Sequence, residues 1–284
     1  MTVALPLFGA FVLGLGARRW LIQHIAFLVR AQLSVGIGLL AVLAGWSFEL
    51  SGGNLAAIGV LLAAQLTALG VATRVFRRRS DHALIAFWMF GNPTYWTAPI
   101  AVAALGAKAA VFVVAYDMLT QPRIALGIRL LRRHATVPQT RTTALADYAP
   151  TIGALAGLLL GRLVPAPDVV TTLVAGLAIA MSAMGVLLLG VSWPKRWIGR
   201  PQLALSFRVL ALHLTLVPCA LALATLAGID LPGAVWLFAL GPVPTSVVSF
   251  AQLYGYSPRT AATGLVMSVA AAIVLLPLAI ALAH

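Results

Sequence analysis

The hydrophobic residues of this chain gather into long apolar stretches, which clusters of charged, Gly and Pro residues separate. A helix needs about 20 apolar residues to cross the hydrocarbon core of a bilayer. The stretches therefore predict membrane-spanning helices with no soluble domain between them. The ten predicted spans are 2–17, 27–47, 55–75, 83–105, 107–131, 148–164, 168–191, 203–227, 231–254 and 259–282.

Composition supports the same class of protein. The 284 residues are 62% hydrophobic and 9% charged, with a mean hydropathy of +1.02. Soluble domains carry about 25% charged residues. The short alternating strands of a membrane β-barrel are not evident in the sequence. We expect an all-α membrane protein.

The distribution of charge predicts the orientation in the membrane. The chain has 19 Lys and Arg against 6 Asp and Glu. Nearly all basic residues follow the odd-numbered predicted helices, whereas the opposite loops hold only Lys108 and Arg162. Loops rich in Lys and Arg stay in the cytoplasm. The pattern predicts a multi-pass protein of the cell (inner) membrane with both termini outside, in contact with lipid and not with nucleic acid.

The two halves of the chain resemble each other. They predict two five-helix repeats, residues 1–146 and 147–284, and an odd number of helices inverts the second copy. Inverted repeats are typical of secondary transporters, whose sites lie near the membrane midplane. The matching segments are Leu5–Ala10 with Ala149–Ala154, Leu62–Thr67 with Leu210–Thr215, Ser34 with Ser182, and Gly91 with Gly241.

The fourth helix of each repeat carries two prolines in mid-span. These are Pro93 and Pro99 in the first repeat, and Pro242 and Pro244 in the second. A proline inside a helix costs about 3 kcal/mol or more because it removes a donor and clashes with the preceding turn. We therefore expect the predicted helices 83–105 and 231–254 to be broken, which in a transporter indicates the substrate site.

A broken helix exposes backbone N–H groups at the start of its second half. Two such ends would form an anion site without a buried cation. Tyr95 and Trp96 are suited to pack against the apolar part of a substrate. The alternative is that the hydroxyl groups only cap their own broken backbone. Neutral side chains that can add hydrogen bonds are Asn92, Thr94, Thr97, Thr245, Ser246 and Ser249.

Two ionisable residues lie deep in predicted spans. Asp117 is about ten residues into its span, where insertion scales give a carboxylate a cost of about 3 kcal/mol. It is either a coupling group for a proton or cation, or a structural partner of the broken fourth helix. His213 lies at similar depth and matches Gln65 in the repeat. We favour an imidazole bonded to a neighbouring helix over a proton relay.

Several segments resemble the auxin efflux carrier family, which includes plant PIN proteins and bacterial relatives. Asn92 and Pro99, seven residues apart, resemble its Gly-Asn…Pro segment, and Tyr116-Asp117 its Tyr-Asp-Leu. Val248 stands where many bacterial relatives have Asn. The segment of the second repeat that resembles the family is Pro244–Phe250, followed by Tyr254, Gly255 and Pro258.

The resemblance implies helices 4 and 9 that cross at their breaks, with Asn92, Pro99 and Pro244 at the crossover. It also implies a scaffold of helices 1, 2, 6 and 7, a moving transport domain of helices 3–5 and 8–10, and a homodimer. Its substrates would be small organic anions, such as auxin-like or dicarboxylic acids.

We therefore expect a secondary active or facilitative transporter of a small organic anion, and not an enzyme, with no cofactor and no metal. One alternative is a sodium- or proton-coupled carrier of the bile-acid or sodium/proton type, with Asp117, His213 and Gln65 in coupling or gating. Another is a membrane-embedded enzyme or a non-transporting membrane protein. The candidate substrate-binding residues are Asn92, Thr94, Tyr95, Thr97, Pro99, Pro242, Pro244, Thr245, Ser246 and Ser249.

Overall fold

The protein is described by a computed structural model, in which every regular element is a helix over the residues described. Helices long and apolar enough to cross a membrane match the second, third, seventh, eighth and tenth predicted spans. The chain is thus an all-helical protein with the long apolar helices typical of a membrane protein. The residues described are 4–75, 94–119, 122, 148–193, 200–243, 247–248 and 258–284.

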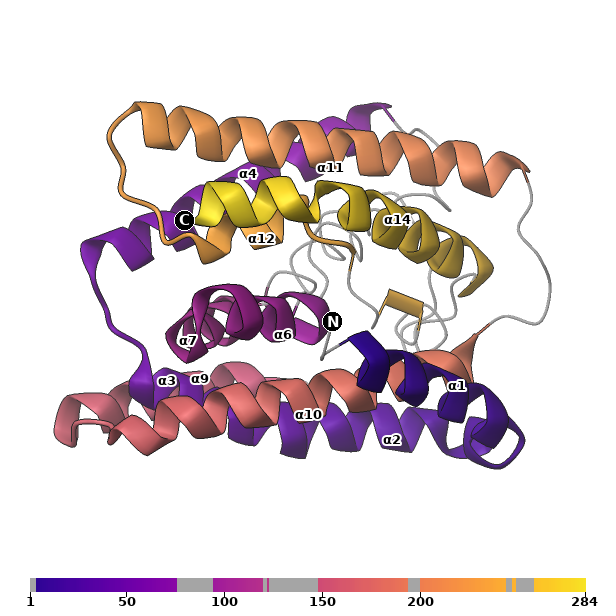
Figure 1. Ribbon diagram of the computed structural model, residues 1–284, viewed down its shortest axis with the longest axis horizontal. Helices are drawn as coiled ribbons and strands as arrows, with labels where there is room; N and C mark the ends of the chain where they lie inside the picture. Colours follow the sequence, from indigo (N-terminus) through magenta and orange to yellow (C-terminus); the bar gives the residue numbers. More distant parts are fainter. Residues whose placement is uncertain are drawn as a thin grey trace. The chain divides into compact units, whose positions relative to one another are not determined.

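The helices form two compact units, each of which is described by itself. In the first unit α1 packs along α10, α3 packs along α9, and α6 and α7 pack on each other and on α10 (Figure 1). Its elements are α1 (Ala4–Leu21), η1 (Ile22–His24), α2 (Ile25–Ala31), the π-helix η2 (Gln32–Ile37), α3 (Gly38–Ser47), α6 (Thr94–Leu105), α7 (Ala107–Asp117), α9 (Ala149–Leu163) and α10 (Asp168–Ser192).

Glycines allow the helices of the first unit to approach closely. The backbone of Gly14 on α1 lies against Leu187 and Gly190 of α10. On α9, Gly157 lies against the backbone of Val42 and Gly45 on α3. A Cβ atom at either position would overlap backbone atoms of the partner helix. Small residues serve this purpose in membrane proteins because lipid supplies no hydrophobic force between helices.

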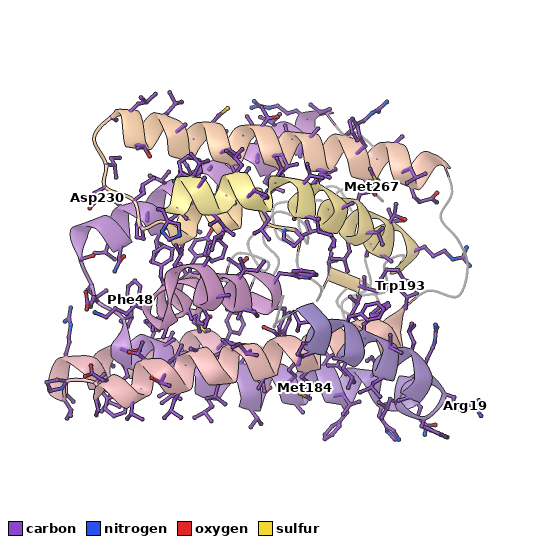
Figure 2. The ribbon with its side chains drawn as sticks, in the orientation of Figure 1. Arg19, Phe48, Met184, Trp193, Asp230 and Met267 are labelled. Carbon is purple, nitrogen blue, oxygen red and sulfur yellow. The ribbon has the colours of Figure 1, made fainter. Side chains whose placement is uncertain are left out.

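Side-chain bonds at the helix ends show the directions of these pairs. Arg18 near the end of α1 donates from Nη1 to the carbonyl of Trp193, which caps α10. Trp46 near the end of α3 donates from Nε1 to the carbonyl of Val164 after α9, at 2.8 Å. Figure 2 shows Trp193 beside α1, where its ring meets Phe11 edge to face at 5.3 Å. Each pair therefore joins its C-terminal ends, so the two helices run in the same direction.

In the second unit α4 packs along α11, and α12 and α14 pack on each other and on α11 (Figure 1). Gly53 at the start of α4 lies against the backbone of Asp230, beyond the end of α11. Gly233, before α12, lies against Ala283 at the end of α14. Both pairs are therefore antiparallel. The elements are α4 (Gly52–Val75), α11 (Arg200–Leu226), α12 (Ala234–Leu240) and α14 (Pro258–Ala283).

The structure changes some predicted helix boundaries. The continuous helix expected over 107–131 is wrong, because α7 ends at Asp117 and a turn follows. The ninth predicted helix is interrupted as expected: α12 ends at Leu240, and Gly241 is extended with ψ of 164°. The fourth predicted helix is described only from Thr94 onward, and α6 continues unbroken through Pro99, so the expectation of a break at that proline is wrong.

Candidate functional site

A buried pair of polar side chains joins the start of α6 to the end of α7. Thr94 donates from its hydroxyl to Oδ2 of Asp117 at 2.5 Å. The two residues are 1% and 3% exposed. The turn at Gly106, with φ of +87°, reverses the chain between the two helices. That conformation favours glycine, and the reversal sets residues 94 and 117 side by side although 23 positions separate them.

Helix α10 forms the wall behind this pair. The hydroxyl of Ser182 donates to the carbonyl of its own Ala178 at 2.6 Å and lies 3.5 Å from that of Thr94. The Tyr95 ring packs directly on Gly185, where an added Cβ would lie 2.9 Å from ring carbons. The Asp117 carboxylate also acts electrostatically on Tyr95. These contacts fix the first turn of α6 against α10.

The indole of Trp96 adds a donor to this region. Its Nε1 atom is buried and has no hydrogen-bond partner among the described residues. An indole N–H can only donate. A buried donor left without a partner costs about 1–3 kcal/mol. The first turn of α6 thus offers a hydrogen bond to an acceptor that the described chain does not supply.

The position of Asp117 follows from Pro122, a signal that the sequence analysis missed. A helix continued through residue 122 would lack the N–H that bonds the carbonyl of Met118. The helix ends at Asp117, and the hydroxyl of Thr151 on α9 donates to that carbonyl at 2.7 Å. The C-terminal end of a helix carries partial negative charge. The end of α7 therefore does not stabilise the negative charge of the Asp117 carboxylate, whereas the hydrogen bond from the Thr94 hydroxyl does.

In the second unit, His213 bonds to α12, the helix that is interrupted at Gly241. Its imidazole hydrogen bonds to the backbone of Phe238 on α12. Pro242 has no N–H to bond the carbonyl of Phe238 within the helix, and the imidazole of His213 bonds to this backbone instead. The histidine thus bonds to a neighbouring helix, the interpretation that the sequence analysis favoured. Gln65 on α4 is buried, with 7% exposure.

The predicted site residues fall into three groups. Thr94, Tyr95, Thr97 and Pro99 are all buried on α6 and share the first unit with Asp117. Pro242, Gln65 and His213 belong to the second unit. The remaining candidates lie outside the described residues, and they are Asn92, Pro244, Thr245, Ser246 and Ser249.

The structure adds residues that the sequence analysis did not assign to the site. Ser182 served there only to align the repeats, although a buried serine in an apolar span is a usable signal. Gln32 was also missed. It lies in η2, is 4% exposed and donates from Nε2 to the carbonyl of Met181, beside Ser182, at 3.0 Å.

The described residues contain no group of three His, Cys, Asp or Glu side chains that is suited to hold a metal ion. A scan against protein-family models and a search of curated proteins find no match to this chain. The assignment of a function therefore depends on the chemistry of the site.

Proposed function

We propose that the protein is a secondary transporter of a small organic anion, related to the auxin efflux carriers, with its substrate site at the first turn of α6. The observation that carries the proposal is the unpartnered, buried N–H of Trp96 in the first turn of α6. Helix N-termini attract anions because their N–H groups and dipole point outward. A carboxylate oxygen of the substrate would accept a hydrogen bond from the indole N–H of Trp96.

The packing of the helices supports two inverted repeats. The repeat relation exchanges helix 1 with 6 and helix 2 with 7. It therefore converts the α1–α10 pair into the α9–α3 pair, and both pairs pack closely through glycines. Both are parallel and tied at their C-terminal ends. Inverted repeats with interrupted helices are the arrangement that alternating-access carriers use.

A second candidate is a carrier coupled to a proton or sodium ion. It is favoured by the burial of Asp117 and by its hydrogen bond from Thr94 at the start of α6. The Asp117 carboxylate accepts the hydrogen bond of the Thr94 hydroxyl, which an anionic substrate would otherwise accept. Substrate binding would then be easier with Asp117 protonated or paired with a cation, which links anion and cation movement.

The direct test is the thermal stability of the purified protein against a panel of carboxylic acids, each with and without sodium at two pH values. A ligand that binds only the folded state at 100 times its Kd raises the free energy of unfolding by about 2.7 kcal/mol. We expect a carboxylate-specific rise in wild type that Trp96→Phe reduces, because phenylalanine keeps a ring but lacks the N–H.

Trp20→Phe is the matched control because Trp20 is 67% exposed at the end of α1. It should retain the full response. An equal response in both variants would contradict the site at α6, and the absence of any carboxylate response in wild type would contradict the anion carrier. A response to sodium or pH alone would favour the coupled carrier with another substrate.

A further inference from the structure

A side chain of α14 holds the backbone that follows α12, and these two helices pack on each other (Figure 1). Val243 donates its backbone N–H to the hydroxyl oxygen of Ser268 at 3.1 Å. The same hydroxyl donates to the carbonyl of Leu265 on its own helix at 2.8 Å. Ser268 is 1% exposed and Val243 is 5% exposed. Ser268 therefore joins α14 to the non-helical backbone just beyond the interruption at Gly241.

The interruption of α12 is held on both of its sides. The imidazole of His213 on α11 bonds to the backbone of Phe238, ahead of the interruption. Ser268 on α14 accepts the N–H of Val243, beyond the interruption. Non-helical backbone in a membrane protein needs such partners because lipid offers none. Pro242, one of the candidate substrate-binding residues, lies between these two points, so neighbouring helices fix its position.

The first unit contains a bond of the same kind. The hydroxyl of Thr94 donates to Asp117, which lies 23 positions later on the next predicted span. The N–H of Val243 donates to Ser268, which lies 25 positions later, also on the next predicted span. The donors are offset along the chain by nearly the same number of positions as the acceptors, and this is nearly the offset that aligns the two repeats in the sequence. Ser268 thus has the place in the second predicted repeat that Asp117 has in the first, with a neutral hydroxyl instead of a carboxyl group.

We propose that Ser268 is a positioning residue for transport, the counterpart in the second repeat of Asp117 in the first. It acts through the backbone, because its bond to Val243 fixes the non-helical segment that contains Pro242. A binding segment that is already held in place loses less conformational freedom when the substrate binds, which raises affinity. The effect of Ser268 on the substrate rests on the proposed function, whereas its effect on the backbone does not.

Hydrogen exchange measured by mass spectrometry tests the hold on the backbone. Val243 is flanked by two prolines, so it carries the one amide hydrogen of segment 242–244. In full-length protein in detergent we compare Ser268→Ala with Thr263→Val. Thr263 is the matched control because it is 0% exposed on α14 and donates to a carbonyl of its own helix at 2.8 Å. We expect the Val243 amide to exchange about tenfold faster or more in Ser268→Ala than in Thr263→Val, because a buried donor without its partner favours local opening. Ser268→Thr keeps a hydroxyl and should restore slow exchange.

Transport kinetics test the effect on the substrate. For a carboxylate that wild-type protein carries, we expect Ser268→Ala to raise KM about threefold or more, because the segment must then be ordered on binding. Thr263→Val should keep the KM of wild type, and Ser268→Thr should restore it. A loss of folded protein alone would lower the maximal rate and leave KM unchanged.

Equal exchange of the Val243 amide in Ser268→Ala and wild type would overturn the proposal. An unchanged KM in Ser268→Ala would also overturn it and would leave the proposed function intact. Wild-type protein that carries no carboxylate would instead contradict the proposed function, and with it the role of Ser268 in transport. Ser268→Cys, whose sulfur is a weak acceptor, replaces Ser268→Ala in both measurements if the alanine variant does not fold.

Discussion

At the scale of single residues, substitutions of Asp117 test whether its carboxyl group stabilises the fold or takes part in transport. Asparagine keeps an oxygen that can accept the hydrogen bond from Thr94, whereas leucine keeps only the volume. A buried hydroxyl deprived of its partner costs about 1–3 kcal/mol. We therefore expect Asp117→Leu to lower the free energy of unfolding by that amount and Asp117→Asn to change it much less. Denaturant titration of the detergent-solubilised variants measures both.

Flux measured on the same variants separates the two roles of Asp117. A coupling carboxyl predicts that Asp117→Asn folds normally and carries substrate without the sodium or pH dependence of wild type. A purely structural carboxyl predicts unchanged coupling in every variant that folds. Thr94→Val removes the hydroxyl donor, which is also a candidate substrate contact, but leaves the carboxyl group in place, so it should keep the sodium or pH dependence of whatever flux remains.

The sequence predicted several polar residues of the site but not the residues that pack around them. Thr94, Tyr95 and Thr97 were selected from composition next to prolines, and all three are buried on α6. A bond between Asp117 and the fourth helix was one of two alternatives that the sequence left open, and the structure shows this bond, whereas the placement of Asp117 inside a continuous span was wrong. The partners on α10, Ser182 and Gly185, depend on how α10 packs, and hydrophobic periodicity does not specify packing.

At the scale of elements, α7 ends before Pro122 and α12 ends before Pro242, and side chains from neighbouring helices bond the backbone four residues ahead of each proline. Pro99, Pro218 and Pro277 instead lie inside continuous helices. Thr151 bonds the carbonyl of Met118 that precedes Pro122 by four residues. His213 bonds the backbone of Phe238, four residues before Pro242. Freed carbonyls in a membrane protein need such partners because lipid offers none. The prolines were readable in the sequence, but the partner residues come from distant segments and were not.

The glycine crossing between α3 and α9 predicts a stability change. An added methyl group at Gly157 meets the backbone of Val42 and Trp46, which cannot move aside as a side chain would. Overpacking of this kind costs about 1–3 kcal/mol. We expect Gly157→Ala to lower the melting temperature of the purified protein.

Gly176→Ala is the matched control for this crossing. Gly176 lies on α10 with no atom within 4 Å of an added Cβ. Alanine there should leave the melting temperature unchanged or raise it, because glycine is about 1 kcal/mol less favourable than alanine in a helix interior. Equal melting temperatures for Gly157→Ala and wild type would mean that α3 and α9 can move apart without a loss of stability.

At the scale of the whole molecule, the directions of the helix pairs agree with the predicted alternation of spans. The first and seventh predicted helices run parallel, as do the second and sixth. The third and eighth are antiparallel, as are the ninth and tenth. Odd- and even-numbered spans should run in opposite directions, so each pair has the relation that ten successive crossings require.

An even number of crossings would place both termini on one side, and the distribution of positive loops predicts that this side lies outside the cell. In Cys219→Ala protein we expect Thr2→Cys and His284→Cys both to react with a membrane-impermeant maleimide on intact cells. Arg196→Cys, in a predicted cytoplasmic loop, should react only after lysis. Labelling of one terminus alone would mean an odd number of spans. That result would remove the inverted relation between the two repeats that the sequence predicts.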